Sequence, residues 1–171
     1  MSTRRLAPAV LLAAALGLGS SCLAESDAEP IEFLCPPAEN FEIVSQVFER
    51  RCGTLDCHGD PGRPFRVYGS AGLRDGFPDA GPPSGGVVVT TPVEIAQNRL
   101  SACAIEPEEM DLVVRGALSS DELTLLQKPR LVQAHKGGRV MAEDSAGDRC
   151  IASWIAGSVD LAACQGELLQ P

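Results

Sequence analysis

The sequence predicts a mostly helical domain with a long loop rich in glycine and proline in its middle. Three stretches, residues 41–51, 91–103 and 145–157, carry the apolar spacing or the start signals of helices. Between the first two, residues 59–91 hold eight glycines and five prolines, a composition that favours loops. The chain contains no internal repeat. These observations indicate a small single-domain, mostly α fold with little sheet.

The N-terminus has the pattern of an export signal over residues 1–21. Arg4 and Arg5 precede a short apolar run, and small residues close it ahead of Cys22. This arrangement resembles a bacterial lipobox, in which the cysteine takes a lipid and becomes the mature N-terminus, although glycine stands at position 19 where the lipobox usually has leucine. Cleavage after Ala24, which would discard Cys22, is the alternative. We expect a lipoprotein that is exported to the periplasm or the cell surface and anchored to a membrane through Cys22.

The chain that follows the signal is acidic. The whole sequence has a formal charge of −9, and its first two arginines lie in the signal, so the chain from Cys22 onwards carries −11. Nucleic acid is excluded as a partner on this ground, because binding it needs a basic surface.

We divide the mature chain into three parts. Residues 22–37, rich in Glu, Ala and Pro, are expected to form a lipid-anchored tether. Residues 38–165 are expected to form the domain, which is long enough to bury a core. Residues 166–171 are left as a C-terminal tail.

The first predicted helix places a cysteine at its end. Asn40 is a suitable N-cap and Gly53 is well placed to end the helix, so Cys52 lies on its last turn. Cys57 and His58 then follow after a short loop. The apolar positions of this helix are Phe41, Val44, Val47 and Phe48.

The middle loop and the second helix come next along the chain. We expect at most short extended pieces at residues 65–68 and 87–90. Thr91 to Glu94 form a capping box with proline at the first helical position. The apolar face of the helix that they open is expected to contain Val93, Ala96, Leu100 and Cys103.

Two further start signals lie in the C-terminal half. Ser119 begins a second capping box, which opens a short helix through Leu126, and Ser145 begins a third, whose helix stops at Gly157. The acidic run at residues 106–111 lacks the ligand spacing of a calcium loop, and we interpret it as an exposed linker.

The pair Cys52 and Cys57, with His58 directly after, carries the chemistry of the chain. Two thiols add to the vinyl groups of a porphyrin and an imidazole ligates its iron, which together hold a haem covalently. The usual attachment run has two residues between its cysteines, whereas this chain has four. The alternative is that both cysteines form disulfides and His58 lies on the surface.

Cysteine parity does not decide between the two interpretations. Besides Cys22, the chain has Cys35, Cys52, Cys57, Cys103, Cys150 and Cys164. With haem on Cys52 and Cys57, the other four would form two disulfides in one of three pairings, and without haem all six would form three.

Four short segments together resemble exported class I-like cytochrome c domains of the myxobacterial and planctomycete type. They are residues 51–59 (Arg-Cys-Gly-Thr-Leu-Asp-Cys-His-Gly), Lys128-Pro-Arg130, His135-Lys-Gly-Gly138 and Ser153-Trp-Ile-Ala-Gly157. The resemblance spans roughly residues 35 to 160. It implies a class I cytochrome c-like helical fold, one covalent haem c on Cys52 and Cys57, and His58 as the proximal iron ligand.

The second axial ligand has two candidates. His135 lies beside two glycines, which let the backbone pass close to a flat ring, and the resemblance also favours this position. Met141 lies in the loop before the last helix, where class I cytochromes carry a distal methionine, although a core methionine is the simpler interpretation. We rank His135 first and Met141 as its alternative.

Five basic residues are candidates to pair with the carboxylates of a haem, although each has the character of an ordinary surface charge. They are Arg63, Arg66, Arg74, Lys128 and Arg130.

The function that these features predict is single-haem electron transfer outside the cytoplasm, with an unidentified redox protein as partner. The chain shows no phosphate-binding glycine loop and no nucleophile elbow, so we do not expect an enzyme. A peroxidase-type activity would need an open axial position on the iron. The alternative is a disulfide-stabilised, non-enzymatic envelope lipoprotein without haem.

Overall fold

Helices dominate the computed structural model, which describes residues 31–75 and 89–170. Its elements are α1 (Phe41–Cys52), α2 (Pro92–Cys103), α3 (Pro107–Val114), the short 3₁₀ turn η1 (Ser120–Glu122), α4 (Thr124–Gln127), α5 (Ala146–Ile155) and α6 (Leu161–Leu168). Within the described residues the strand pairing consists of one isolated bridge between Tyr68 and Leu73. The predicted mostly α class is confirmed.

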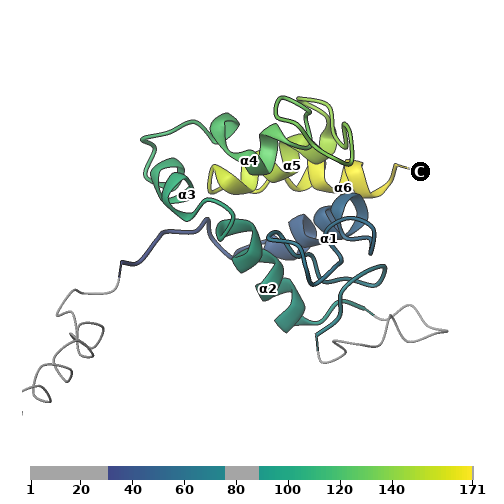
Figure 1. Ribbon diagram of the computed structural model, residues 1–171. Helices are drawn as coiled ribbons and strands as arrows, with labels where there is room; N and C mark the ends of the chain where they lie inside the picture. The colour runs from purple at the N-terminus through teal and green to yellow at the C-terminus, as the bar shows by residue number, and fades with distance from the viewer. Residues whose placement is uncertain (1–30, 76–88, 171) are drawn as a thin grey trace, which may run out of the picture. The chain divides into compact units, whose positions relative to one another are not determined.

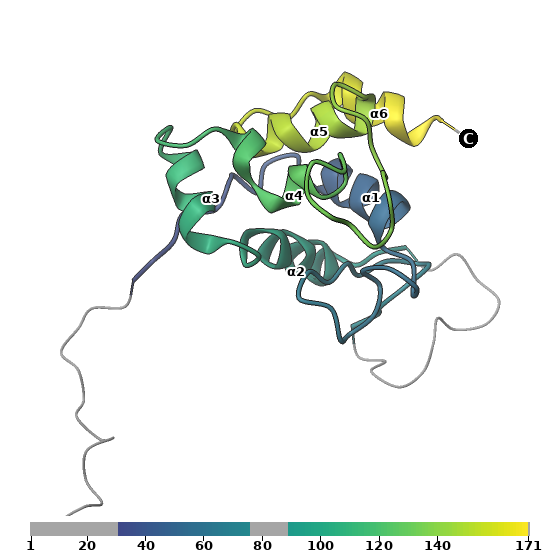
Figure 2. The ribbon, with the colours of Figure 1, turned by 45° about the horizontal axis from the view of Figure 1, so that its top comes forward.

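Helix α1 lies at the centre of the arrangement. In two views it has α2 on one side and α5 and α6 on the other (Figure 1, Figure 2). The ring of Trp154 on α5 packs 4.7 Å, centroid to centroid, from that of Phe41 and 6.3 Å from that of Phe48. These three rings are fully buried and join α1 to α5 through apolar contact.

The ends of α1 are partly as predicted. Cys52 is its last residue, and Gly53 follows as the C-cap, with its N–H donating to the carbonyl of Glu49. Asn40 does not cap the helix through its side chain, because its backbone adopts the left-handed conformation at φ 57°.

The capping box of α2 is confirmed, but its predicted apolar face is wrong in most positions. Val93 and Leu100 are 57% and 60% exposed, and Ala96 is exposed as well. The helix instead buries Glu94 and Asn98. Only Cys103 of the predicted face is buried.

Helix α2 buries polar side chains and exposes apolar ones because of its contacts with the middle loop. The Asn98 amide accepts from the Tyr68 N–H (2.6 Å) and donates to the Tyr68 carbonyl (2.9 Å), as a neighbouring strand would. The Glu94 carboxylate receives the Arg74 guanidinium at 2.8 and 3.0 Å. Both buried polar groups are therefore satisfied by a segment that lies 20 to 30 residues earlier.

The acidic run at residues 106–111 is not a linker, because most of it belongs to α3. Pro107 stands at the first helical position, and Glu108 and Glu109 occupy the first turn, where negative charge is favourable. Glu106 accepts from the N–H (2.7 Å) and the hydroxyl of Thr124. This contact fastens the start of α3 to the start of α4.

The second capping box is also wrong in detail. The Ser119 hydroxyl accepts from the N–H of Asp121, which gives only η1. Leu123 then adopts an extended conformation at ψ 135°, and α4 begins after it. One predicted helix is thus two short pieces.

Helix α5 starts and stops as predicted, at the Ser145 cap and near Gly157, which has φ 86°. Helix α6 follows and was not predicted. It includes residues 165–168, so the expected end of the domain falls inside it. A disulfide between Cys150 and Cys164 joins the two helices.

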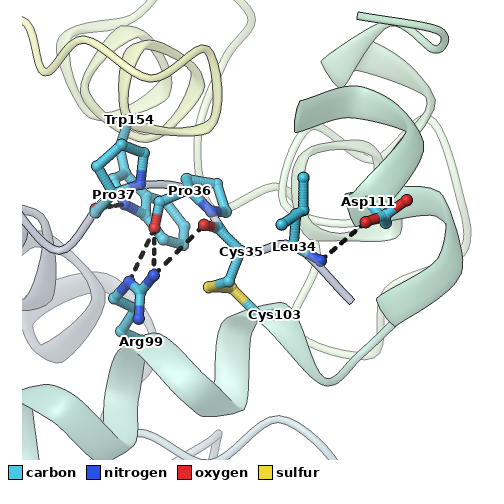
Figure 3. The surroundings of a disulfide bond; sticks show 8 residues. All are labelled: Leu34, Cys35, Pro36, Pro37, Arg99, Cys103, Asp111 and Trp154. Atoms are coloured by element: carbon cyan, nitrogen blue, oxygen red, sulfur yellow. Dashed lines mark hydrogen bonds between the residues drawn. A yellow bond between two sulfur atoms is a disulfide. The ribbon is translucent and has the colours of Figure 1, made fainter. Parts of the chain in front are cut away.

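The last residues of the expected tether are fastened to the helices (Figure 3). Cys35 forms a disulfide with Cys103 at the end of α2, and the Leu34 N–H donates to Asp111 on α3 at 2.8 Å. The Arg99 guanidinium donates to the Pro36 carbonyl at 2.6 and 2.8 Å. The helical unit therefore begins before residue 38.

Several expectations fall on residues that the structure does not describe. These are the signal at residues 1–21, the lipidation at Cys22, most of the tether, and residues 87 and 88 of the second extended piece. In the remainder, no helix has the length and apolar character needed to cross a bilayer.

Candidate cofactor site

A cavity of about 510 Å³ opens beside the C-terminal end of α1. Its walls come from α1, the turn after it, α4 and the loop 129–141, and they are mostly apolar, including Phe48, Phe65, Leu125 and Val140. Volume and lining are typical of small-molecule and cofactor sites. The five residues singled out from the sequence, Cys52, Cys57, His58, His135 and Met141, all line it.

A turn brings the two cysteines to the same wall despite their wide spacing. The Cys57 N–H donates to the Thr54 carbonyl at 2.9 Å, and the His58 N–H donates back to the Cys52 carbonyl at 2.8 Å. Of the four spacer residues, Gly53 is buried and the other three are exposed, with Leu55 half exposed. The turn therefore accommodates all four spacer residues while both cysteines line the same cavity.

The two cavity cysteines carry free thiols, while the other four described cysteines form the pairs 35–103 and 150–164. Burial raises the pKa of the Cys52 thiol to about 12, and the nearby Cys57 contributes in the same direction. Cys52 is therefore held as a neutral thiol at physiological pH.

The ring of His58 is oriented by the loop that follows it. Its Nδ1 lies 2.9 Å from the Phe65 carbonyl, and the Val67 N–H donates to the His58 carbonyl at 2.8 Å. A carbonyl can only accept, so Nδ1 carries the proton and Nε2 keeps a free lone pair. Burial is the main cause that lowers the pKa of His58, and the charges of His135, Arg63 and Lys128 add to it.

His135 repeats this arrangement on the loop 129–141. Its Nδ1 lies 2.8 Å from the Gly138 carbonyl, which again leaves Nε2 free. The two imidazole rings are parallel within 6°, and their centroids are 6.3 Å apart.

This separation fits two imidazoles that ligate one metal ion from opposite sides. A metal–imidazole bond is about 2.0–2.1 Å and a ring nitrogen lies roughly 1.1 Å from the ring centre, which places the two centroids about 6 Å apart. A carbonyl on the far nitrogen of each ring is the usual partner of a metal-ligating histidine.

A metal ion that is held in a porphyrin needs only two ligands from the protein. Among residues 31–75 and 89–170, no cluster of three or more His, Cys, Asp or Glu side chains is placed to hold a metal ion. A porphyrin supplies four nitrogens of its own, so two opposed imidazoles are sufficient.

Met141 also lines the cavity, but its sulfur lies against α5. It is 4% exposed, and its Sδ is 3.0 Å from the position that a Cβ on Gly147 would take. The structure thus places His135, not Met141, opposite the ring of His58.

Two of the five basic candidates line the cavity, Arg63 and Lys128. Arg74 forms a buried ion pair with Glu94, Arg130 pairs with Asp148, and Arg66 points its Nε to the Arg63 carbonyl. The structure adds Arg51 and Lys136, which line the cavity next to a predicted ligand in the sequence. That adjacency was the signal that could have found them.

The turn that carries His58 depends on tight glycine packing, which the sequence analysis missed. A Cβ on Gly59 would lie 2.2 Å from the Gly53 carbonyl oxygen, and one on Gly72 would lie 2.0 Å from the same atom. Three backbones therefore meet at Gly53, and only glycine fits at the other two positions.

Comparisons with protein-family models, with curated proteins and with solved structures found no match to this chain.

Proposed function

We propose that this chain is a single-haem c-type cytochrome-like electron carrier that works outside the cytoplasm. Cys52 and Cys57 attach the haem through thioethers, and His58 and His135 are its axial ligands. The observation that carries the proposal is the pair of parallel imidazoles, 6.3 Å apart, in an apolar cavity that two unpaired cysteines also line.

The surroundings of the site support this assignment. When bound, a haem supplies one-electron chemistry, and the protein tunes it through its ligands and the polarity of the pocket. Carbonyls of Phe65 and Gly138 orient the ligand rings, while Phe48 and Phe65 limit the access of water. The basic side chains of Arg63 and Lys128 offset the negative charge of the haem carboxylates.

Two imidazole ligands favour electron transfer over catalysis. A peroxidase-type reaction needs an open position on the iron, which a second imidazole ligand would fill. Two imidazoles also give a lower reduction potential than an imidazole with a thioether.

The attachment is tested by the intact mass and the absorbance of protein exported from a host that can attach haem. We expect one haem mass that survives denaturation, and the sharp visible bands of a reduced c-type haem. The double variant Cys52→Ala, Cys57→Ala should lose the covalent mass, whereas Leu55→Ala in the spacer should keep it. Colourless wild-type protein with Cys52 or Cys57 in a disulfide would refute the proposal and favour the haem-free envelope lipoprotein.

The axial pair is tested separately. His135→Ala should change the spectrum of the oxidised protein from six-coordinate, low-spin iron to high-spin iron, while Met141→Leu should leave it unchanged. The reverse result would make Met141 the distal ligand.

Export and lipidation complete the proposal. The N-terminal pattern supports an exported protein that carries a lipid on Cys22. The same intact-mass measurement reports a lipid adduct independently of the haem.

A further inference from the structure

The outward face of α2 is apolar and carries no charged side chain. Val93, Ala96, Leu100 and, directly after the helix, Ala104 are exposed along one side, and Val89 just before the helix is 80% exposed. A surface helix normally turns charged or polar residues to water on this side. In α2 the outward stripe is instead the more apolar one.

The two charged residues of α2 are both engaged elsewhere. Glu94 is buried against Arg74, and the guanidinium of Arg99 donates to the carbonyls of Cys35 and Pro36. The outward face is therefore uncharged in a mature chain with a formal charge of −11.

The tether is fixed to the same helix. The disulfide from Cys35 reaches Cys103 at the C-terminal end of α2 (Figure 3). Phe33 and Leu34 come just before Cys35 in the chain and are each 42% exposed. Eleven residue steps separate Cys22 from Phe33, which span at most about 40 Å. A lipid on Cys22 would hold Phe33 within that distance of a membrane, and the disulfide would hold this end of α2 a short way beyond it.

A second copy of the chain is a poorer occupant of this face. A stable dimer needs roughly 800 Å² from each partner. Helix α2 is only about 18 Å long, and its stripe has two large and two small side chains, so the area falls short. A tethered lipid surface needs no such area, because the tether already supplies a high effective concentration.

The charge on the helix that follows α2 favours one kind of membrane surface. Glu108 and Glu109 are exposed on α3, which follows α2 directly. Anionic headgroups would repel these carboxylates, whereas zwitterionic headgroups would not.

We propose that the outward face of α2 rests on a zwitterionic lipid surface, with Val93 and Leu100 in contact with the boundary between headgroups and acyl chains. The contact is an interfacial one along the helix. This inference rests on the lipidation of Cys22 in the proposed function, but it does not depend on the haem.

The test uses the full lipid-bearing protein in phosphatidylcholine vesicles whose acyl chains carry a photoreactive diazirine. Cross-links mapped by peptide mass spectrometry should concentrate on residues 89–104. The double variant Val93→Glu, Leu100→Glu should reduce them about tenfold or more, since both side chains are solvent-exposed and the fold is retained. The matched control Leu131→Glu, Val132→Glu changes an exposed apolar pair in the loop 129–141 and should leave the yield of lipid cross-links unchanged.

Two results would overturn the inference, and a third outcome would bear only on the proposed function. Cross-links that concentrate on residues 131–132 would remove the α2 face as the lipid contact while leaving lipidation intact. An intact mass without a lipid adduct would remove the anchor itself. Loss of the haem spectrum with an unchanged cross-link pattern would contradict only the proposed electron-transfer function.

Discussion

Replacing Glu94 by glutamine tests whether the buried ion pair holds the middle loop that orients His58. Glu94 is 1% exposed and accepts hydrogen bonds from the Arg74 guanidinium and from the N–H groups of Asp75 and Thr91. Glutamine keeps one acceptor oxygen and turns an NH₂ group towards donors. The substitution removes two charge-assisted bonds from a buried pair. At about 1.5–3 kcal/mol each, their loss predicts a decrease of about 3–6 kcal/mol in the free energy of unfolding.

Urea unfolding at pH 7 measures this decrease, and Glu49→Gln is the matched control. Burial raises the pKa of Glu49, although hydroxyls of Thr90 and Ser45 oppose the shift. Its ionised form is therefore disfavoured in the folded protein, and Glu49→Gln should be as stable as the wild type or more stable. A loss below about 1 kcal/mol for Glu94→Gln with an unchanged m-value, or a larger loss for Glu49→Gln, would refute the reasoning.

The pH dependence should separate the two carboxyls. Burial acts to raise the pKa of Glu94, but the N–H groups of Thr91 and Asp75 and the charge of Arg74 outweigh it, so the pKa is lowered. The stability from Glu94 is thus present above its unfolded pKa near 4.5 and is lost as the pH falls through the lower folded value. The gap between wild type and Glu94→Gln should narrow in acid, whereas any advantage of Glu49→Gln should appear as the pH rises above 4.5.

Three further predictions concern the site and its frame. Gly59→Ala should destabilise the protein by about 1–3 kcal/mol and shift the imidazole resonances of His58 in NMR spectra, because the new Cβ would lie 2.2 Å from a backbone oxygen. The control Gly166→Ala, in an open position of α6, should be neutral or stabilising. In reduced, haem-free protein at pH 8, Cys52 should react with a disulfide reagent about 30–50-fold more slowly than in the urea-unfolded chain. Its pKa of about 12 lowers the thiolate fraction roughly 1000-fold, and the higher nucleophilicity of a high-pKa thiolate recovers only part of the lost rate. Equal rates in the folded and unfolded chain would contradict the burial of Cys52. Cys164→Ala should lower the free energy of unfolding by about 3 kcal/mol because it opens a short disulfide loop, and an unchanged Tm would show that α6 is held by other contacts.

The sequence predicted those parts of the fold that local chemistry decides. The Thr91 and Ser145 caps, the stop at Gly157 and the position of Cys52 at the end of α1 all follow from side chains that satisfy the nearest backbone groups. Helix α3 carried a comparable signal in Pro107 and was missed because its charges were interpreted as a linker.

The face of α2 could not be predicted in the same way. Its buried positions are set by Arg74 and the backbone of Tyr68, which lie far away along the chain. Periodicity assigns Glu94 and Asn98 to solvent, and only tertiary partners can reverse this assignment.

At the site, the chemical groups could be predicted from the sequence, but their positions and orientations relative to one another could not. It identified His58 and His135 as candidate ligands, but the parallel rings depend on the carbonyls of Phe65 and Gly138, which no side-chain pattern reveals. These carbonyls fix both tautomers, so the two free nitrogens become available at the same cavity.

The wide cysteine spacing was the strongest argument against a haem-attachment motif, and the local backbone weakens it. Attachment requires two thiols beside one cavity and an imidazole next to the second thiol, and the number of residues between them matters only through the path of the chain. The N–H of Cys57 donates to the Thr54 carbonyl, and the N–H of His58 donates to the Cys52 carbonyl, so the chain between the two cysteines forms a turn. A motif defined by its spacing would exclude this chain, whereas one defined by where its groups lie is compatible with it.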